Sequence, residues 1–397
     1  MGQEMTERFD GGEKAEALIE KARAMIPVLR ERAAAHAADR RISRDTMRDL
    51  SEAGFFRVLQ PQRWSGFEMD PRVFAQIQMA LAEGDMSTAW VYGVVGVHPF
   101  QLALFDDRAA KDVWGDNPDV LIASTYMPTG RAKPVSGGFE FSGRWKFSSG
   151  SEHCDWVFLG GLVGDPAQGD YRTFMLPKSD YRIEDTWHVL GLKGTGSQDI
   201  VVESVFVPDY RVHNLADAYS GTNPGNAVNT GWLYKLPFPL VFGRAVSSGC
   251  IGALQALLDA FCDYGAKRIN TAGSSTARDP DAQLAAAEAH AGIEEMTATL
   301  HRNYAAMVGY AKAGQQTPTD EKLLYKYQSA AVADRCLDLA GKLFRCVGGS
   351  GLFETLPFSR LYADLITARQ HVSNQSQVWG RNLGGTLMGL ENADRQI

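Results

Sequence analysis

Carboxylate side chains are missing from two long stretches in the C-terminal half of this chain. The chain has 47 Asp and Glu residues, yet none lies between Leu236 and Leu258 or between Leu365 and Leu390. An enzyme that abstracts a proton from its substrate needs a base positioned beside it. Neither stretch offers a carboxylate for that role. The second one contains His371, and an imidazole titrates near neutral pH.

An excess of positive charge and a long apolar run are absent as well. The net charge is −7, which argues against a nucleic-acid surface, because such surfaces neutralise phosphates with basic side chains. No apolar run approaches the roughly 18 residues that cross a bilayer. Residues 1–13 are polar and lack the apolar segment of a signal peptide. We therefore expect a cytoplasmic protein that binds neither nucleic acid nor membrane.

Cysteines are few and scattered, and no two of them form a C-x-x-C pair. Their odd number and wide spacing predict buried free thiols in a reducing compartment and no metal site. A G-x-G-x-x-G turn between a strand and a helix is also absent, so the sequence predicts no Rossmann site for NAD(P)H. A reduction by nicotinamide would then need a separate protein. The five cysteines are Cys154, Cys250, Cys262, Cys336 and Cys346.

The hydrophobic pattern divides the chain into three parts. Residues 1–118 have apolar residues at helical spacing, beginning with a helix over about residues 12–38. Residues 119–215 contain short runs of β-branched and aromatic residues bounded by glycines, which predict strands. Helical periodicity returns in residues 216–397 after a connecting loop at 216–234. The order predicts an α+β fold with an N-terminal helical domain, a middle β-barrel or sandwich domain and a C-terminal four-helix bundle.

Three glycine-containing motifs occur along these parts. Gly143–Gly150 reads Gly-Arg-Trp-Lys-Phe-Ser-Ser-Gly and is followed by the apolar run Asp155–Leu159. Gly191–Ser197 reads Gly-Leu-Lys-Gly-Thr-Gly-Ser, and Gly348–Gly351 reads Gly-Gly-Ser-Gly. In this order, and with helices on both sides of a β region, the motifs resemble the acyl-CoA dehydrogenase superfamily over roughly residues 15–385. The resemblance implies an acyl-CoA dehydrogenase-like fold that binds flavin.

The chain departs from the dehydrogenases at their catalytic carboxylate. The late position of that carboxylate falls on or beside Val372, and the earlier position falls near Phe242, so neither is acidic. With the Trp145–Gly150 motif, His98 and His371, the chain is more similar to the flavin-dependent monooxygenases built on this scaffold. They include the phenolic secosteroid 4-hydroxylase and p-hydroxyphenylacetate 3-hydroxylase oxygenases.

That resemblance implies the oxygenase component of a two-component system. A separate NAD(P)H:flavin reductase would supply reduced FMN, or else FADH2. Oxygen would then form a C4a-hydroperoxyflavin that hydroxylates a phenolic or other aromatic ring, in aromatic or steroid breakdown or in the modification of aromatic natural products. No metal is implied. An acyl-CoA dehydrogenase or oxidase, disfavoured by the missing carboxylates, and a non-catalytic flavin-binding protein are the alternatives.

The resemblance implies three catalytic side chains. Ser149 falls where the dehydrogenases carry a Thr beside flavin N5, and a hydroxyl that accepts from N5–H would delay the loss of hydrogen peroxide. We expect His371 to take the phenolic proton and His98 to contact the substrate. The alternatives are a serine that satisfies its own turn, a histidine on a helix surface and a histidine satisfied in the core.

The expected cofactor contacts also follow from the family. Phe147 falls where the dehydrogenases stack a Trp, and the chain around Tyr126 passes along the flavin edge, where Tyr126 also reaches the substrate. Arg268 matches an Arg that binds the cofactor phosphate of a neighbouring subunit, with a solvated surface pair as the alternative. The Gly348–Gly351 turn would make a similar contact, so we expect a homotetramer built as a dimer of dimers. The expected cofactor-binding residues are Trp90, Ser124, Thr125, Tyr126, Phe147, Ser148, Ser149, Arg268, Gly348, Gly349, Ser350, Ser373 and Asn374.

Overall fold

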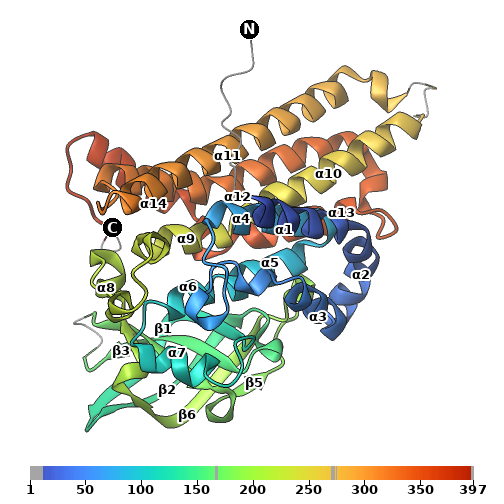
Figure 1. Cartoon of the computed structure of the whole chain (residues 1–397). Helices are drawn as coiled ribbons and strands as arrows, with labels where there is room; N and C mark the ends of the chain where they lie inside the picture. The colour runs from blue at the N-terminus through green and yellow to red at the C-terminus, as the bar shows by residue number, and fades with distance from the viewer. Residues whose placement is uncertain (1–11, 166–168, 270–272, 274, 395–397) are drawn as a thin grey trace.

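The computed structural model describes residues 12–165, 169–269, 273 and 275–394, so the polar residues 1–11 lie outside the described part. Within it, helices, a β-sheet and again helices follow one another along the chain, which confirms the predicted α+β architecture. Figure 1 shows the sheet at one end of the molecule and the long C-terminal helices at the other, with α5 between them.

The N-terminal part is helical, as predicted, but its first helix is broken. The expected continuous helix over 12–38 divides at Met25, two residues before Pro27. Proline fits the first turn of a helix but cannot donate the hydrogen bond that a helix interior needs, so a new helix begins there. The helices are α1 (Glu13–Ala24), α2 (Ile26–Asp39), α3 (Arg44–Glu52), α4 (Pro71–Gly84), α5 (Met86–Gly96), α6 (His98–Leu102) and α7 (Asp107–Trp114).

The middle part of the described chain is a single seven-stranded sheet with the order β5-β6-β2-β1-β3-β4-β7. The first two strands form an antiparallel hairpin, in which Val135 pairs with Gly138 around Gly137. Gly137 has a φ of 77°, a conformation that glycine adopts at no steric cost. The strands are β1 (Ile122–Val135), β2 (Gly138–Ser148), β3 (Trp156–Val163), β4 (Tyr171–Pro177), β5 (Arg182–Glu184), β6 (Gln198–Pro208) and β7 (Val212–Asn214).

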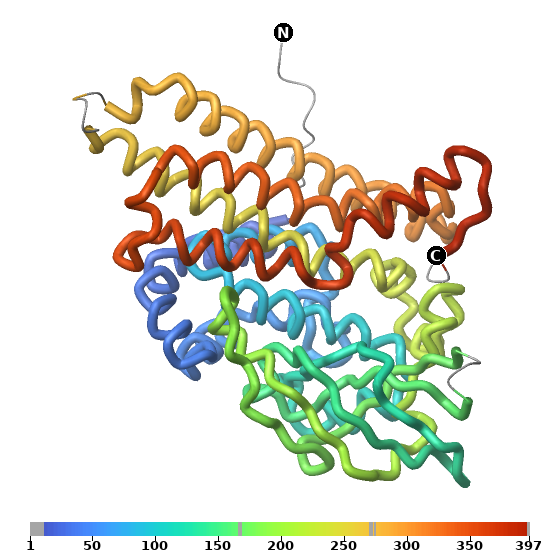
Figure 2. Tube along the Cα trace, turned by 180° about the vertical axis from the view of Figure 1, so that it is seen from behind, coloured from blue at the N-terminus to red at the C-terminus, as the bar shows by residue number. Residues whose placement is uncertain are grey.

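The C-terminal part is a helical bundle. Figure 2 shows its long helices α10, α11 and α12 running side by side. The stretch Phe238–Lys267 is long and apolar enough to cross a membrane, but 78% of its most apolar window is buried inside the protein. It is therefore accounted for as a core segment. The helices are α8 (Leu215–Ser220), α9 (Phe238–Ala245), α10 (Ser248–Lys267), α11 (Pro280–Lys312), α12 (Thr319–Val347), α13 (Phe358–Arg369) and α14 (Ser376–Leu387).

Two details differ from the expectations. The segment 216–234, expected as a connecting loop, contains most of α8, which begins after Asn214. The side chain of Asn214 accepts from the N–H of Ala216, a cap that starts a helix even in a polar segment. The cysteines are free thiols, but only three of them are buried, because Cys262 on α10 is exposed and Cys346 is partly accessible.

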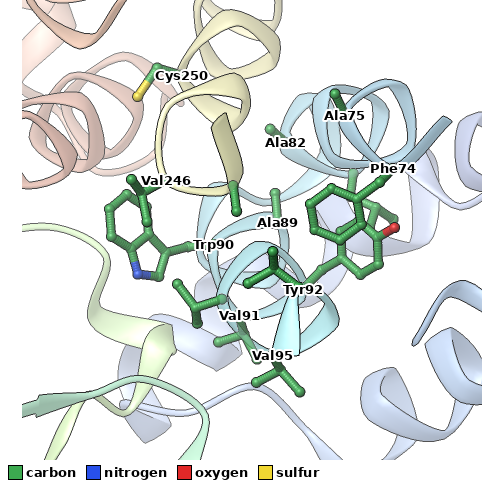
Figure 3. Packing of buried hydrophobic residues seen from close by; sticks show 14 of the residues in the cluster. Phe74, Ala75, Ala82, Ala89, Trp90, Val91, Tyr92, Val95, Val246 and Cys250 are labelled. Atoms are coloured by element: carbon green, nitrogen blue, oxygen red, sulfur yellow. The ribbon is translucent and has the colours of Figure 1, made fainter. Parts of the chain in front are cut away.

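Helix α5 is the central element of the core, because every one of its residues is buried. A helix that is apolar on all sides is stable only when other elements surround it. Figure 3 shows Trp90 and Tyr92 leaving α5 in different directions, Trp90 beside Val246 and Tyr92 beside Phe74. A Cβ at Gly93 would lie 2.3 Å from the carbonyl oxygen of Ala245, so glycine is required where α5 meets the end of α9.

Candidate functional site

Ser149 follows β2 directly and lies in a chain of buried hydroxyl groups. Its Oγ is 2.6 Å from Oγ of Ser197, which is 2.7 Å from Oγ1 of Thr195. The hydroxyl of Thr195 donates to the carbonyl oxygen of Leu192 at 2.9 Å. From the other side, the indole N–H of Trp90 donates to Ser149 Oγ at 3.2 Å. The side chain of Ser149 is thus held by α5 and by the loop before β6.

An irregularity in β2 shapes this corner. The pairing of β2 with β6 shifts register between Trp145 and Ser148, and Phe147 within the shift has a φ of 69°. This left-handed conformation costs about 1–2 kcal/mol for a residue with a Cβ, and such strain clusters at ligand sites. Phe147 is 58% exposed, and its ring centroid is 6.2 Å from that of Trp187. A planar ligand can stack on an exposed aromatic ring at this position.

The loop of residues 191–197, which carries two of the hydroxyls, is fixed by close packing. Asp364 on α13 accepts from the backbone N–H of Leu192 at 2.6 Å. A Cβ at Gly191 would lie 2.0 Å from the carbonyl oxygen of Ala363, so the loop backbone lies directly on α13. Burial raises the pKa of Asp364 to about 7. A carboxyl that is often neutral can be buried here without a full counter-charge.

Four aromatic side chains, which we call the aromatic cluster, meet beside Ser149. They are Trp90, Tyr126, Phe242 and His371. The His371 ring centroid is 5.7 Å from that of Trp90 and 6.1 Å from that of Phe242, and Phe242 is 5.1 Å from Tyr126. Tyr126, Phe242 and His371 each keep part of their surface accessible. The cluster joins α5, β1, α9 and the turn after α13, and an aromatic molecule can contact it.

His371 caps the short turn that follows α13. Its Nδ1 accepts from the backbone N–H of Ser373 at 3.2 Å, so the neutral ring carries its hydrogen on Nε2. Desolvation lowers the pKa of His371 to about 4, so the ring is neutral near pH 7 although part of its surface is accessible. In this tautomer Nε2 donates a hydrogen bond and has no lone pair to receive a proton.

His98 has the opposite tautomer. Its Nδ1 lies 2.5 Å from the carbonyl oxygen of Ile122, which can only accept, so Nδ1 carries the hydrogen and Nε2 has a lone pair. His98 is fully buried, its Nε2 has no partner in the described part of the chain, and burial lowers its pKa to about 4. Its ring centroid is 5.5 Å from that of Phe158 and 6.3 Å from that of Tyr126. Of the two histidines, His98 has the free lone pair.

The other predicted residues of β1 and β2 lie close to this corner. Thr125 donates its hydroxyl to the carbonyl oxygen of Lys146 at 2.8 Å, so its side chain serves the β1–β2 contact. Tyr126 donates to Oε1 of Gln101 on α6, and burial raises the pKa of Tyr126 well above its usual value. Ser124 is buried too, and Ser148 is fully buried with no partner for its hydroxyl in the described chain.

Asn374 and Ser373 hold the turn that presents His371. Asn374 is fully buried, and its Nδ2 donates to the carbonyl oxygens of Val246 and Ala368, both at 2.9 Å. Its Oδ1 has no partner among the described residues. The Asn374 side chain therefore joins this turn to the segments that follow α9 and end α13.

Arg268 and the Gly348–Gly351 turn form a separate corner. Arg268 donates to the carbonyl oxygen of Val347, immediately before the turn, and its guanidinium lies 5.2 Å from the Tyr264 ring centroid. A Cβ at Gly348 or Gly349 would meet nothing within 4 Å, and Ser350 is partly accessible. Arg268 follows a 20-residue helix, α10, whose other end lies beside Val246. Such a helix is about 30 Å long, so this corner is far from the aromatic cluster of the same chain.

A surface hollow of about 530 Å³ lies elsewhere, between α11 and α12 at Tyr310 and Tyr325, and none of the predicted site residues line it.

Sequence reasoning missed several residues of the Ser149 corner. Ser197 and Thr195 lie within a motif that was noted only for its glycines, and the two hydroxyls in it were a usable signal. Asp364 gave no local signal, because its partner Leu192 is 172 residues away.

The residues present fit a flavin. Phe147 offers an exposed ring beside Ser149, and Ser149 offers a buried hydroxyl at the end of a strand. The aromatic cluster adjoins Ser149 through its member Trp90, so a second aromatic molecule could lie beside the flavin. No Asp or Glu of the described chain takes part in the cluster.

Comparison with known proteins agrees with this geometry. The N-terminal and C-terminal domain models of acyl-CoA dehydrogenase match residues 12–114 and 245–376. The chain is 36% identical over 377 residues to the oxygenase subunit HsaA of a flavin-dependent monooxygenase from Rhodococcus jostii, covering 94% of this chain and 99% of that one. It is 31% identical to the oxygenase component of an FADH2-dependent resorcinol hydroxylase from Rhizobium, covering 89% of each.

A solved structure of the 3-HSA hydroxylase from Rhodococcus superposes with a TM-score of 0.92 at 35% identity, covering 96% of this chain and 99% of that chain. The match extends through all three parts of the fold rather than one domain. These findings confirm the resemblance inferred from the motifs. The chain belongs to the oxygenase components of the flavin-dependent monooxygenases that are built on the acyl-CoA dehydrogenase fold.

Proposed function

We propose that this protein hydroxylates a phenolic or related aromatic substrate with reduced flavin and oxygen. The observation that carries the proposal is the position of Ser149, hydrogen-bonded to Trp90 and next to an accessible aromatic cluster without a carboxylate. When reduced flavin is bound, it is the group that reacts with oxygen. The protein's part is to hold the substrate ring, to place polar groups around it and to limit access of water.

In this proposal the two histidines have different roles toward the substrate oxygen. His371 donates from Nε2 to the substrate oxygen, which favours the phenolate form. His98 is buried, and its Nε2 lone pair can receive the phenolic proton when the neighbouring Tyr126 turns aside. The initial expectation gave the proton to His371, and the tautomer imposed by the N–H of Ser373 is the reason for moving it to His98.

The corner made by Arg268 and the Gly348–Gly351 turn serves a neighbouring copy of the chain. A guanidinium beside open glycine backbone suits a phosphate group. Because α10 is long, this corner is too far from the flavin ring site of its own chain to bind the flavin held there. Leu352 and Phe353, directly after the turn, are 70% and 65% exposed, as expected of surface that another subunit covers. We propose the homotetramer, a dimer of dimers, on this basis.

The cofactor, the reductase and the compartment are part of the same proposal. FMN was the first expectation, but a phosphate-binding corner apart from the flavin ring site favours the longer FADH2. The resorcinol hydroxylase relative is also named as FADH2-dependent. A separate NAD(P)H:flavin reductase supplies the reduced flavin. Free thiols at all five cysteines are consistent with the cytoplasm.

Reconstitution tests the proposal. The protein is mixed with a phenol, oxygen, NADH, an unrelated flavin reductase and either FMN or FAD, and the products are separated by chromatography. We expect a catechol in the complete mixture and none without the reductase. The same protein is given an acyl-CoA with an artificial electron acceptor. Efficient oxidation of the acyl-CoA with no catechol from any phenol would contradict the proposed function.

A further inference from the structure

The hydroxyl chain at Ser149 has a direction that can be read from its ends. A carbonyl oxygen can only accept, so the Thr195 hydroxyl, which bonds Leu192, has its hydrogen committed there. Thr195 Oγ1 must then accept from Ser197, and Ser197 Oγ must accept from Ser149. Each hydroxyl has one hydrogen to donate, so the hydrogen of Ser149 points to Ser197.

The other neighbour of Ser149 completes the assignment. Trp90 Nε1–H can only donate, so it occupies one of the two lone pairs of Ser149 Oγ. One lone pair of Ser149 Oγ is left, so Ser149 can only accept a hydrogen bond from a further neighbour. We propose that Thr195 and Ser197 are positioning residues that orient the hydroxyl of Ser149 as a hydrogen-bond acceptor, and thereby make the site select reduced over oxidised flavin. This inference rests on the flavin site of the proposed function.

The selection follows from the chemistry of flavin N5. In reduced flavin N5 carries a hydrogen and donates, which suits the remaining lone pair of Ser149. In oxidised flavin N5 is an acceptor, and two acceptors facing each other form no hydrogen bond. Ser149 could donate to oxidised flavin only by giving up its hydrogen bond to Ser197, or, to keep that bond, by the turning of all three hydroxyls, which would break the bond from Thr195 to Leu192. One hydrogen bond corresponds to roughly a two- to tenfold change in an equilibrium constant.

Neighbouring hydrogen bonds hold the segments that carry the three hydroxyls in place. The N–H of Gly150, next to Ser149, donates to the carbonyl oxygen of Thr195 at 2.9 Å, which ties the two segments together. Asp364 accepts from the N–H of Leu192, and the indole N–H of Trp187 donates to the Leu192 carbonyl oxygen at 3.0 Å. Leu192, at the end of the chain of hydroxyls, is therefore held at both its N–H and its carbonyl oxygen.

The test measures the dissociation constants of oxidised and reduced FMN, the latter under anaerobic conditions, for the full-length protein and its variants. Thr195→Val removes the acceptor below Ser197, so Ser197 can donate to Ser149 and the hydrogen of Ser149 is freed for the flavin. We expect the preference for reduced flavin to fall by about two- to tenfold in Thr195→Val and in Ser197→Ala. Ser197→Thr retains a hydroxyl and should restore the preference.

Ser151→Ala is the matched control, because the Ser151 hydroxyl is also buried, two residues from Ser149, but has no partner in the described chain. Its ratio of dissociation constants should equal that of the unchanged protein. Circular dichroism checks that each variant is folded. An unchanged ratio in folded Thr195→Val and Ser197→Ala would overturn the inference while leaving catechol formation by the unchanged protein intact. A protein that binds neither form of FMN or FAD would instead overturn the proposed function.

Discussion

The indole N–H of Trp90 donates to the hydroxyl of Ser149, which lies 59 residues further along the chain and in a different layer of the fold. The same indole ring meets the imidazole of His371 with centroids 5.7 Å apart. Trp90 therefore stands between the two parts of the proposed site, where the flavin edge and the substrate ring would meet. Because α5 is buried along its whole length, this arrangement is held by the core rather than by a surface loop.

Replacing Ser149 by Ala should uncouple flavin consumption from hydroxylation. The substitution removes the proposed acceptor for N5–H and leaves Phe147 and the aromatic cluster in place. One lost hydrogen bond predicts roughly a two- to tenfold rise in the ratio of hydrogen peroxide to catechol. Both products are measured after limited NADH has been consumed. Ser151→Ala serves again as the control, and a Ser149→Ala protein as well coupled as the control would refute this role.

Replacing Arg268 by Gln should weaken the binding of the cofactor phosphate and leave the residues around the flavin ring unchanged. The change removes the charge but keeps an amide that can donate to the Val347 carbonyl oxygen. We expect weaker binding of FAD and little effect on FMN, because only FAD carries the second phosphate. Titration with each flavin measures this difference. Equal weakening for both flavins, or none for either, would argue against a phosphate contact at this corner.

The fold was largely predictable because its pattern is local. Helical periodicity and glycine-bounded β runs depend on neighbouring residues, and the β1–β2 hairpin at Gly137 follows from one turn. The chemistry of the site was less accessible. The tautomers of His98 and His371 depend on Ile122 and Ser373, and only the second of these is a near neighbour of its histidine. No spacing rule connects residues that meet only after three layers have packed.

The buried histidines should make the protein less stable in mild acid. Burial lowers the pKa values of His98 and His213 to about 4, against about 6.5 in an unfolded chain. Between those values the unfolded state binds protons that the folded state does not. Each histidine therefore removes up to about 1.4 kcal/mol of stability per pH unit as the pH falls from 6.5 to 4. Urea unfolding of His213→Gln over this range should show a shallower loss than the unchanged protein, and an identical slope would contradict it.

Asp364 should act with the opposite sign. Its folded pKa of about 7 lies above its unfolded value of about 3.8, so its contribution is fully present below pH 3.8 and is lost as the pH rises towards 7. Asp364→Asn keeps an oxygen that can accept from Leu192 and removes the titration. Urea unfolding measures the free energy of unfolding of the variant and of the unchanged protein at each pH. We expect the ratio of the variant's value to that of the unchanged protein to rise between pH 5 and 8. A ratio that is constant or falls would show that Asp364 is ionised in the folded protein.

The last prediction decides which histidine receives the phenolic proton. His98→Gln should slow hydroxylation by ~10²–10⁴-fold, which is the usual worth of a positioned base. The defect should shrink for phenols made more acidic by ring substituents, and as the pH approaches the ordinary phenol pKa of ~10, because solvent then removes the proton. His371→Gln retains an amide N–H in place of Nε2–H and can still stabilise the phenolate, so it should lose less, with a defect that depends less on phenol acidity than that of His98→Gln. Initial rates across a series of phenols, with saturating reduced flavin, measure both. If the His371→Gln defect shrinks with phenol acidity and the His98→Gln defect does not, the proton goes to His371 and its ring must turn away from Ser373 to receive it.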